Sequence, residues 1–214
     1  MCEAIAADAK VVLDRLEKAH PDARIYLDFK TPLELLVATI LAAQCTDEKV
    51  NEVAPQLWKA FPTARDLAGA DPRKVEQVVK PTGFFRKKAA SVQAVCRTVL
   101  DEFGGKVPDT LEELTRLPGV GRKTANIVLG QAFGRPAVAV DTHVQRVSLR
   151  IGLARGKQPD RIGEELCAIM PRERWRRATE LIGTHGRRIC TARKPACPKC
   201  PVNMLCDYYG AANR

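Results

Sequence analysis

Four cysteines near the C-terminus lie much closer together than the other four cysteines of the chain. Four thiolates in so short a segment can close around one metal ion or one iron–sulfur cluster. Structural zinc more often uses two separated C-x2-C pairs, and this segment has only one, so the spacing alone leaves zinc and a cluster equally open. The four residues are Cys190, Cys197, Cys200 and Cys206.

A second segment with chemical potential joins two expected helices through a turn bracketed by glycines. Residues 117–125 have the sequence Leu-Pro-Gly-Val-Gly-Arg-Lys-Thr-Ala. Glycine has no Cβ, so the backbone at Gly119 and Gly121 can approach an anion closely, and the following helix adds its positive N-terminal end. A Gly-x-Gly pair also marks ordinary helix corners. Because Arg122 and Lys123 follow directly, the segment favours binding of DNA phosphates.

Lys123 is also a candidate nucleophile. The neighbouring Arg122 and the positive helix end both disfavour an added proton, so part of the lysine population would be the neutral amine. A neutral amine can attack an electrophilic carbon and form a Schiff base. Taken without further information, the residues favour the simpler interpretation that Lys123 is one more phosphate-binding lysine.

Asp141 and His143 lie at the expected start of another helix, in the segment Val-Asp-Thr-His. An Asp in this place is most simply an N-cap. A carboxylate held by helix N–H groups also stays ionised, which suits it to stabilise positive charge that develops during a reaction. His143 is a candidate for proton transfer, but a lone helical His more commonly bonds to phosphate, backbone or water. We therefore expect Asp141 to be catalytic and His143 to contact DNA.

The elements that position these residues are expected to be helices. Apolar residues recur at spacings of three and four, and alternating apolar and polar runs are nearly absent. Thr31 with Glu34, and Thr110 with Glu113, have the spacing of a capping box. The one strand candidate, Ala137–Val140, has no visible partner and is interpreted as an extended connector. The expected fold class is all-α.

Composition narrows the choice of partners. The chain has 214 residues, 45% of them hydrophobic, which is enough for one core or two small lobes. Lys and Arg outnumber Asp and Glu by 35 to 25, which favours nucleic acid, although a solvated basic surface explains the charge equally well. No apolar run is long enough for a membrane span, and the first residues lack the layout of a secretory signal. A cytoplasmic, reducing location is expected, in which crowded cysteines indicate a metal site.

Three features follow one another along the chain: the hairpin at residues 117–125, the segment Val140–His143 and the four-cysteine tail. In this combination and order, the chain resembles the endonuclease III family of helix-hairpin-helix DNA glycosylases. The resemblance implies base-excision repair of double-stranded DNA, with removal of a damaged, oxidised pyrimidine and β-elimination at the abasic site. It implies that Lys123 attacks the sugar carbon that carries the base and that Asp141 assists. It also implies that the four cysteines bind a 4Fe–4S cluster.

The same resemblance implies two helical lobes with the active site in the cleft between them. One lobe would span residues 29–136 and contain the helix-hairpin-helix at about 111–133. The other would join residues 1–28 to residues 137–214 and carry the cluster loop, residues 190–206. The protein would act as a monomer.

Two further loops would open the duplex, because a base must leave the stack before it can react. By resemblance, Gln44 fills the gap left by the flipped nucleotide, and Phe84 wedges between the bases opposite. The sequence departs from the family pattern here, with Phe84 where leucine is usual and Cys45 where alanine is usual. Phe84 and Phe85 are adjacent, so at least one of them is expected near the surface. The departure leaves the preferred opposite base open.

Two other functions share parts of this pattern. A monofunctional, adenine-removing glycosylase has the hairpin, the Asp and the cluster, but it lacks the hairpin lysine and usually carries an extra C-terminal domain. Lys123 and the length of this chain argue against it. A non-catalytic iron–sulfur protein that binds DNA or transfers electrons would use the same cysteines without Schiff-base chemistry.

Arg193 and Lys194 lie between the first two clustered cysteines, and a bound cluster would hold this basic loop in a fixed shape against DNA phosphates. Replacing both with Ala should lower DNA affinity and reduce the slope of its salt dependence by about 1 per lost phosphate contact. Binding titrations at several salt concentrations check this. Unchanged affinity at every salt level contradicts it.

Overall fold

A computed structural model describes residues 2–212, with side chains for residues 8–211, and within this range every regular element is a helix. The expected all-α fold class is confirmed for that part of the chain. The helices form two compact units, one made of Ile25–Gly134 and the other of Met1–Arg24 with Arg135–Arg214. Residues 1 and 213–214, at the ends of the expected second lobe, lie outside the described residues. None of the helices in the described range is long and apolar enough to cross a membrane.

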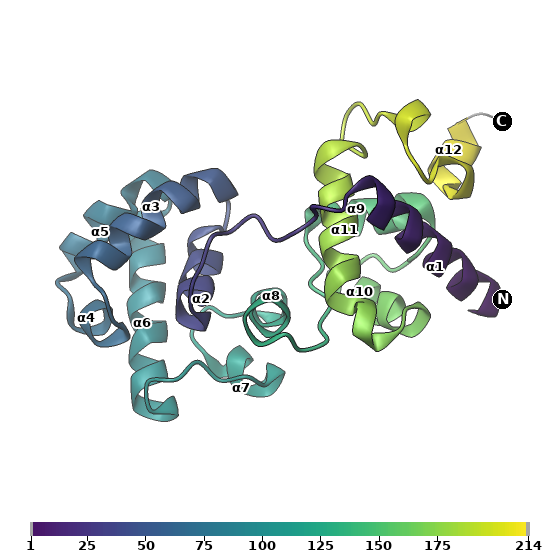
Figure 1. Ribbon diagram of the computed structural model, residues 1–214. Coiled ribbons are helices and arrows are strands. Elements are labelled where there is room, and N and C mark those ends of the chain that lie inside the picture. The colour runs from purple at the N-terminus through teal and green to yellow at the C-terminus, as the bar shows by residue number, and fades with distance from the viewer. Residues whose placement is uncertain (1, 213–214) are drawn as a thin grey trace. The chain divides into compact units, whose positions relative to one another are not determined.

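The unit Ile25–Gly134 contains the blue and teal helices of Figure 1. Its elements are α2 (Pro32–Leu41), α3 (Asp47–Ala60), α4 (Ala64–Gly69), α5 (Pro72–Val79), the 3-10 helix η1 (Lys80–Thr82), α6 (Phe85–Phe103), α7 (Leu111–Arg116) and α8 (Arg122–Phe133). Helices α4 and α5 pack along α6, α2 packs against α3, α6 and α8, and α7 packs against α8. The expected hairpin is thus present as α7, a short turn and α8.

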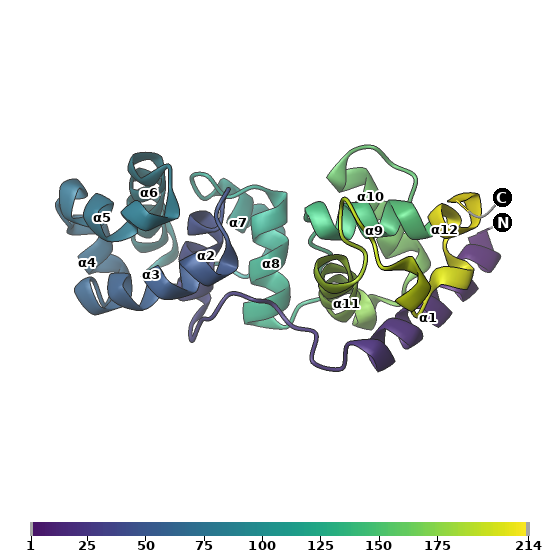
Figure 2. The same ribbon diagram turned by 90° about the horizontal axis from the view of Figure 1, so that it is seen from above.

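The other unit joins the two ends of the chain. Its elements are α1 (Cys2–Ala19), α9 (Thr142–Ile151), α10 (Pro159–Ile169), η2 (Arg172–Arg174), α11 (Trp175–Arg188), η3 (Cys197–Lys199), η4 (Asn203–Leu205) and α12 (Asp207–Ala212). Both views of the ribbon place α1 beside α11, far from it in sequence (Figures 1 and 2). Ion pairs Arg174–Asp14 and Arg177–Glu17 join η2 and α11 to α1.

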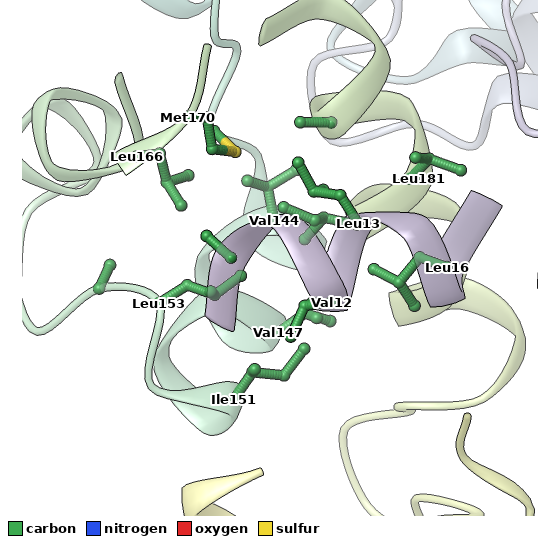
Figure 3. Close-up of a cluster of buried hydrophobic side chains, with 14 of the residues drawn as sticks. Val12, Leu13, Leu16, Val144, Val147, Ile151, Leu153, Leu166, Met170 and Leu181 are labelled. Atoms are coloured by element: carbon green, nitrogen blue, oxygen red, sulfur yellow. The ribbon is translucent and has the colours of Figure 1, made fainter. Parts of the chain in front are cut away.

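Apolar side chains from α1, α9 and α11 form the core of this second unit (Figure 3). Leu13 and Leu16 of α1 are fully buried among Val147 of α9 and Leu181 of α11. Burial of one such leucine side chain contributes about 1.5–3 kcal/mol. This core fixes α9, and therefore the residue that begins it, relative to the C-terminal segment.

Helix starts follow the threonine signals, but the glutamates of the two expected capping boxes bond elsewhere. Thr31 Oγ1 accepts a hydrogen bond from the N–H of Glu34 at 3.2 Å, and Thr110 Oγ1 accepts one from the N–H of Glu113 at 3.3 Å. The Glu34 carboxylate accepts from the N–H of Lys30, one residue before the cap, and the Glu113 carboxylate accepts from the Thr110 hydroxyl. The expected caps are therefore confirmed, whereas the reciprocal half of each box is wrong.

Ala137–Val140 lies outside any helix and is buried, as expected for an extended connector. It begins after Gly134, which ends α8 in the left-handed conformation with φ 63°. It leads into Asp141, the residue that caps α9. The interpretation of this stretch as a connector rather than a strand is confirmed.

Candidate functional site

The turn between α7 and α8 is anchored by two apolar side chains and exposes its glycines. Leu117 and Val120 are buried, and the N–H of Val120 donates to the carbonyl of Leu117 at 3.1 Å. Gly119 has φ +76°, a conformation that favours glycine. A Cβ on Gly121 would meet no atom within 4 Å, so the space beside its backbone is open to an external group.

No side chain caps the start of α8, as is also the case for α6, α10 and α11. Side chains cap six other helices, namely α2, α3, α4, α5, α7 and α9. Gly121, Arg122 and Lys123 are all exposed at this uncapped start. Its first backbone N–H groups and the positive end of the helix can therefore bind an anion from outside.

Asp141 is the N-cap of α9, as its position in the sequence predicts. Its Oδ1 accepts hydrogen bonds from the N–H groups of His143 at 2.9 Å and Val144 at 2.7 Å. Its Oδ2 lies 3.5 Å from Nδ1 of His143. The side chain is partly exposed, so one oxygen holds the helix while the carboxylate still reaches the surface.

His143 is half-buried beside this carboxylate. Burial lowers the pKa of its imidazole, Asp141 opposes that effect, and Arg187 and Arg146 reinforce it. At 3.5 Å the contact of Nδ1 with the Asp141 carboxylate is longer than an ordinary hydrogen bond. The ring is therefore mainly neutral near pH 7 and can exchange hydrogen bonds with a ligand.

Gln44 and Phe84 share a backbone property that the sequence did not indicate. They are the two non-glycine residues of the described range with positive φ, at 53° and 47°. Such residues each cost about 1–3 kcal/mol and persist only where surrounding contacts hold them, often at functional sites. Both side chains are exposed, and Phe84 is 66% exposed whereas Phe85 is half-buried. Of the two phenylalanines, Phe84 is the one presented to solvent.

The four clustered cysteines line one cavity, together with Ile151, His185 and Tyr208 among others. All seven cysteines with described side chains are free thiols. Burial raises the pKa of Cys200 and of Cys206, and the neighbouring cysteine sulfurs raise both further. In residues 8–211, no group of three or more His, Cys, Asp and Glu side chains is arranged to hold a single metal ion.

Arg150 of α9 supports the loop that contains the first cysteine. Its guanidinium donates to the carbonyls of Thr191 and Ala192, each at 2.8 Å, and lies 3.5 Å from Cys190 Sγ. The Thr191 hydroxyl donates to the carbonyl of Lys194 at 2.7 Å, which closes the loop. The side chains of Arg193 and Lys194 are exposed on this supported loop.

A buried histidine pair, missed by the sequence analysis, lies behind the cysteines. His185 Nε2 is 3.4 Å from Cys200 Sγ, and its Nδ1 is 3.0 Å from His20 Nε2. Burial is the main cause that lowers the pKa of His185 to about 4. Both histidines are therefore neutral hydrogen-bonding groups near pH 7. No local signal marks them, because 165 residues separate them in sequence.

Comparison with known proteins defines the class to which this fold and these residues belong. A family model described as "HhH-GPD superfamily base excision DNA repair protein" matches residues 37–172. The match includes the α7–α8 hairpin and the start of α9, which carry Lys123 and Asp141. The fold is thus that of a helix-hairpin-helix base-excision repair protein.

Relatives narrow the class further. Endonuclease III of Synechocystis is 49% identical over 92% of this chain and 91% of that protein, and endonuclease III of Bacillus subtilis is 40% identical over 91% and 89%. A solved structure described as a trapped covalent intermediate of endonuclease III with DNA has a TM-score of 0.93 and 40% identity, covering 98% of this chain and 99% of that one. The chain belongs to the endonuclease III family, which confirms the resemblance found in the sequence.

The capping bond of Asp141 can be separated from its charge. Asp141→Asn keeps an oxygen that accepts from His143 and Val144, so the free energy of unfolding should change by less than about 0.5 kcal/mol, whereas Asp141→Ala should lose about 0.5–2 kcal/mol. Urea unfolding followed by circular dichroism measures both. Equal destabilisation by the two variants would show that α9 depends on the charge and not on the cap.

Proposed function

We propose that this protein is a DNA glycosylase with abasic-site lyase activity of the endonuclease III type, and that Lys123 is its nucleophile. The observation that carries the proposal is the exposed amine of Lys123 at the uncapped start of α8, directly after the glycine turn, in a chain of this family. An uncapped helix start attracts the DNA backbone, and the lysine within its first turn is then held next to a sugar.

The proposed reaction begins with attack of the neutral Lys123 amine on the sugar carbon that carries the damaged base. A bond forms between Nζ and that carbon, the bond to the base breaks, and the base leaves with its electron pair and takes up a proton. Loss of the amine proton and opening of the sugar ring give a Schiff base. Removal of a proton from the neighbouring sugar carbon then expels the 3′ phosphate, which cuts the strand.

Asp141 is proposed to act on the same step through its charge. Positive charge builds on the sugar as the base departs, and a fixed carboxylate stabilises such charge most when it does not have to reorganise. The two N–H bonds from His143 and Val144 hold the Asp141 carboxylate in a fixed orientation. The carboxylate can also accept the proton that the attacking amine loses.

The remaining exposed residues are proposed to bind and open the duplex. The backbone at Gly119 and Gly121, with Arg122, binds phosphates without reading sequence, and His143 adds a contact. Gln44 and Phe84 are proposed to enter the stack at the flipped nucleotide and at the opposite strand. Their left-handed backbones place both side chains outward in advance, which reduces the ordering cost of binding.

We further propose that the four cysteines hold a 4Fe–4S cluster. Four thiols that line one cavity can hold one cluster, and their spacing in the sequence is the one that the family resemblance assigns to a 4Fe–4S site. When bound, the cluster would order the C-terminal segment and contribute folding free energy rather than take part in hydrolysis or elimination. Arg193 and Lys194 on the supported loop would then meet DNA phosphates.

The proposed substrate is double-stranded DNA with oxidised pyrimidines or abasic sites, handled by a monomer. A reducing cytoplasm, where bacterial DNA lies, agrees with the free cysteines. The two other candidate functions differ from this proposal in one chemical respect. Neither an adenine-type monofunctional glycosylase nor a non-catalytic iron–sulfur protein would form a Schiff base with an abasic site.

Borohydride reduction converts a lysine Schiff base into a stable amine, so it distinguishes these functions. The parent protein should form a covalent adduct with a duplex that contains an abasic site, and Lys123→Ala should lose at least about 99% of it, because removing a nucleophile costs several orders of magnitude. Lys106→Ala, which removes an exposed lysine elsewhere in the same unit, is the matched control and should retain the adduct. Absence of an adduct in the parent protein overturns the lyase.

Protein purified without oxygen should contain iron and inorganic sulfide in equal amounts and absorb broadly in the visible range. Cys200→Ser should reduce the iron content and the stability together, because cluster binding contributes to folding. Cys167→Ser, at a half-buried cysteine that does not line the cavity, is the control and should keep both. Purification with stoichiometric zinc and no sulfide would contradict the cluster.

A further inference from the structure

We propose that Lys88 is a positioning residue whose buried ammonium braces the left-handed turn that presents Phe84. The inference rests on the proposed function, because it assigns Lys88 to the step in which the duplex is opened. It concerns neither the nucleophile nor the cluster. Lys88 acts through this turn and touches no DNA itself.

Lys88 is buried in a way that is rare for lysine. It lies in the first turn of α6 and is only 4% exposed, whereas the adjacent Lys87 is exposed. Its Nζ donates to the carbonyl of Thr82 at 2.7 Å. Lysine is almost never fully buried unless its charge is compensated, since taking an ammonium out of water is costly. The free-energy cost of burying this ammonium must therefore be offset by the contacts that it makes.

Lys88 contacts the backbone on both sides of Phe84. Thr82 is the last residue of η1 and is 2% exposed, and two left-handed residues follow it, Gly83 with φ 72° and Phe84 with φ 47°. The ammonium of Lys88 binds the carbonyl before this pair, and the backbone N–H of Lys88 donates to the carbonyl of Phe84 at 3.1 Å. The backbone bond is the first hydrogen bond of α6, so the contribution particular to the lysine is the side-chain bond to Thr82.

The ammonium also suits the electrostatics of this position. The carbonyls at the C-terminal end of a helical turn carry partial negative charge, and a cation there is favourable. Burial lowers the pKa of Lys88, and the bond to the Thr82 carbonyl compensates part of the cost of that burial.

The turn that presents Phe84 would be misplaced if the cation were lost. Lys88→Met keeps the length and apolar stem of the side chain but leaves the carbonyl of Thr82 without its donor. The turn would then sample other conformations, and the cost of ordering it would be added to the cost of opening the duplex. A substrate that is already open would not require this step.

The test compares borohydride trapping rates on two substrates, an abasic site in a fully paired duplex and the same site inside a bubble of unpaired bases. In Lys88→Met the rate on the paired duplex should fall between about 10- and 100-fold, as expected for small misplacements remote from the chemistry, while the rate on the bubble changes less than about twofold. Fluorescence of 2-aminopurine placed opposite the abasic site, which rises when that base is unstacked, should fall in parallel. Lys87→Met removes the same charge one residue earlier and should leave the ratio of the two rates at its parent value.

The outcomes separate this inference from the proposed function. No adduct on either substrate in the parent protein would overturn the lyase itself. An adduct in the parent, with the same ratio of rates in Lys88→Met as in Lys87→Met, would overturn the role of Lys88 alone. If circular dichroism shows that Lys88→Met is unfolded, Lys88→Leu takes its place, because it also removes the donor and the charge but has a smaller apolar side chain, and the same ratio decides.

Discussion

The unpaired N–H groups at the start of a helix are the constraint on which the rest of this structure depends. The first turn of any α-helix has donors that the helix itself cannot satisfy. At α9 a side chain satisfies them, since the carboxylate of Asp141 binds two of these groups. At α8 no side chain does, and the exposed Arg122 and Lys123 lie there instead. The same local physics thus yields an oriented carboxylate at one helix and an anion site beside an amine at the other.

This constraint explains why so much of the site was predictable from the sequence. Caps and glycine turns depend only on residues that are close together in the sequence. Thr31, Thr110 and Asp141 therefore predict the starts of their helices. The glycines at 119 and 121 predict the turn of the hairpin. The capping glutamates were predicted less well because a carboxylate chooses among several nearby donors. Glu34 bonds to the N–H of Lys30 rather than to that of the cap itself.

Features that depend on distant contacts were not predictable in the same way. Nothing local favours positive φ at Gln44 or Phe84, since neither residue is a glycine. Beside Phe84, one contact comes from the buried side chain of Lys88, which bonds to the carbonyl of Thr82. The sequence spacing does place Lys88 on the buried face of α6, because it lies four residues before the buried Val92. A lysine in such a position is nevertheless ordinarily assigned to the surface. The His20–His185 pair could not be predicted because 165 residues separate its two members in the sequence.

The proposed reaction requires that the amine of Lys123, at the start of α8, and no other amine forms the covalent bond to the DNA sugar. Proteolysis of the borohydride-reduced complex, followed by mass spectrometry, locates the residue that carries the sugar remnant. The modification should be found on Lys123, in the peptide that continues into Thr124 and Ala125. Modification of any other lysine, or of the N-terminal amine, with Lys123 unmodified, would contradict the central claim.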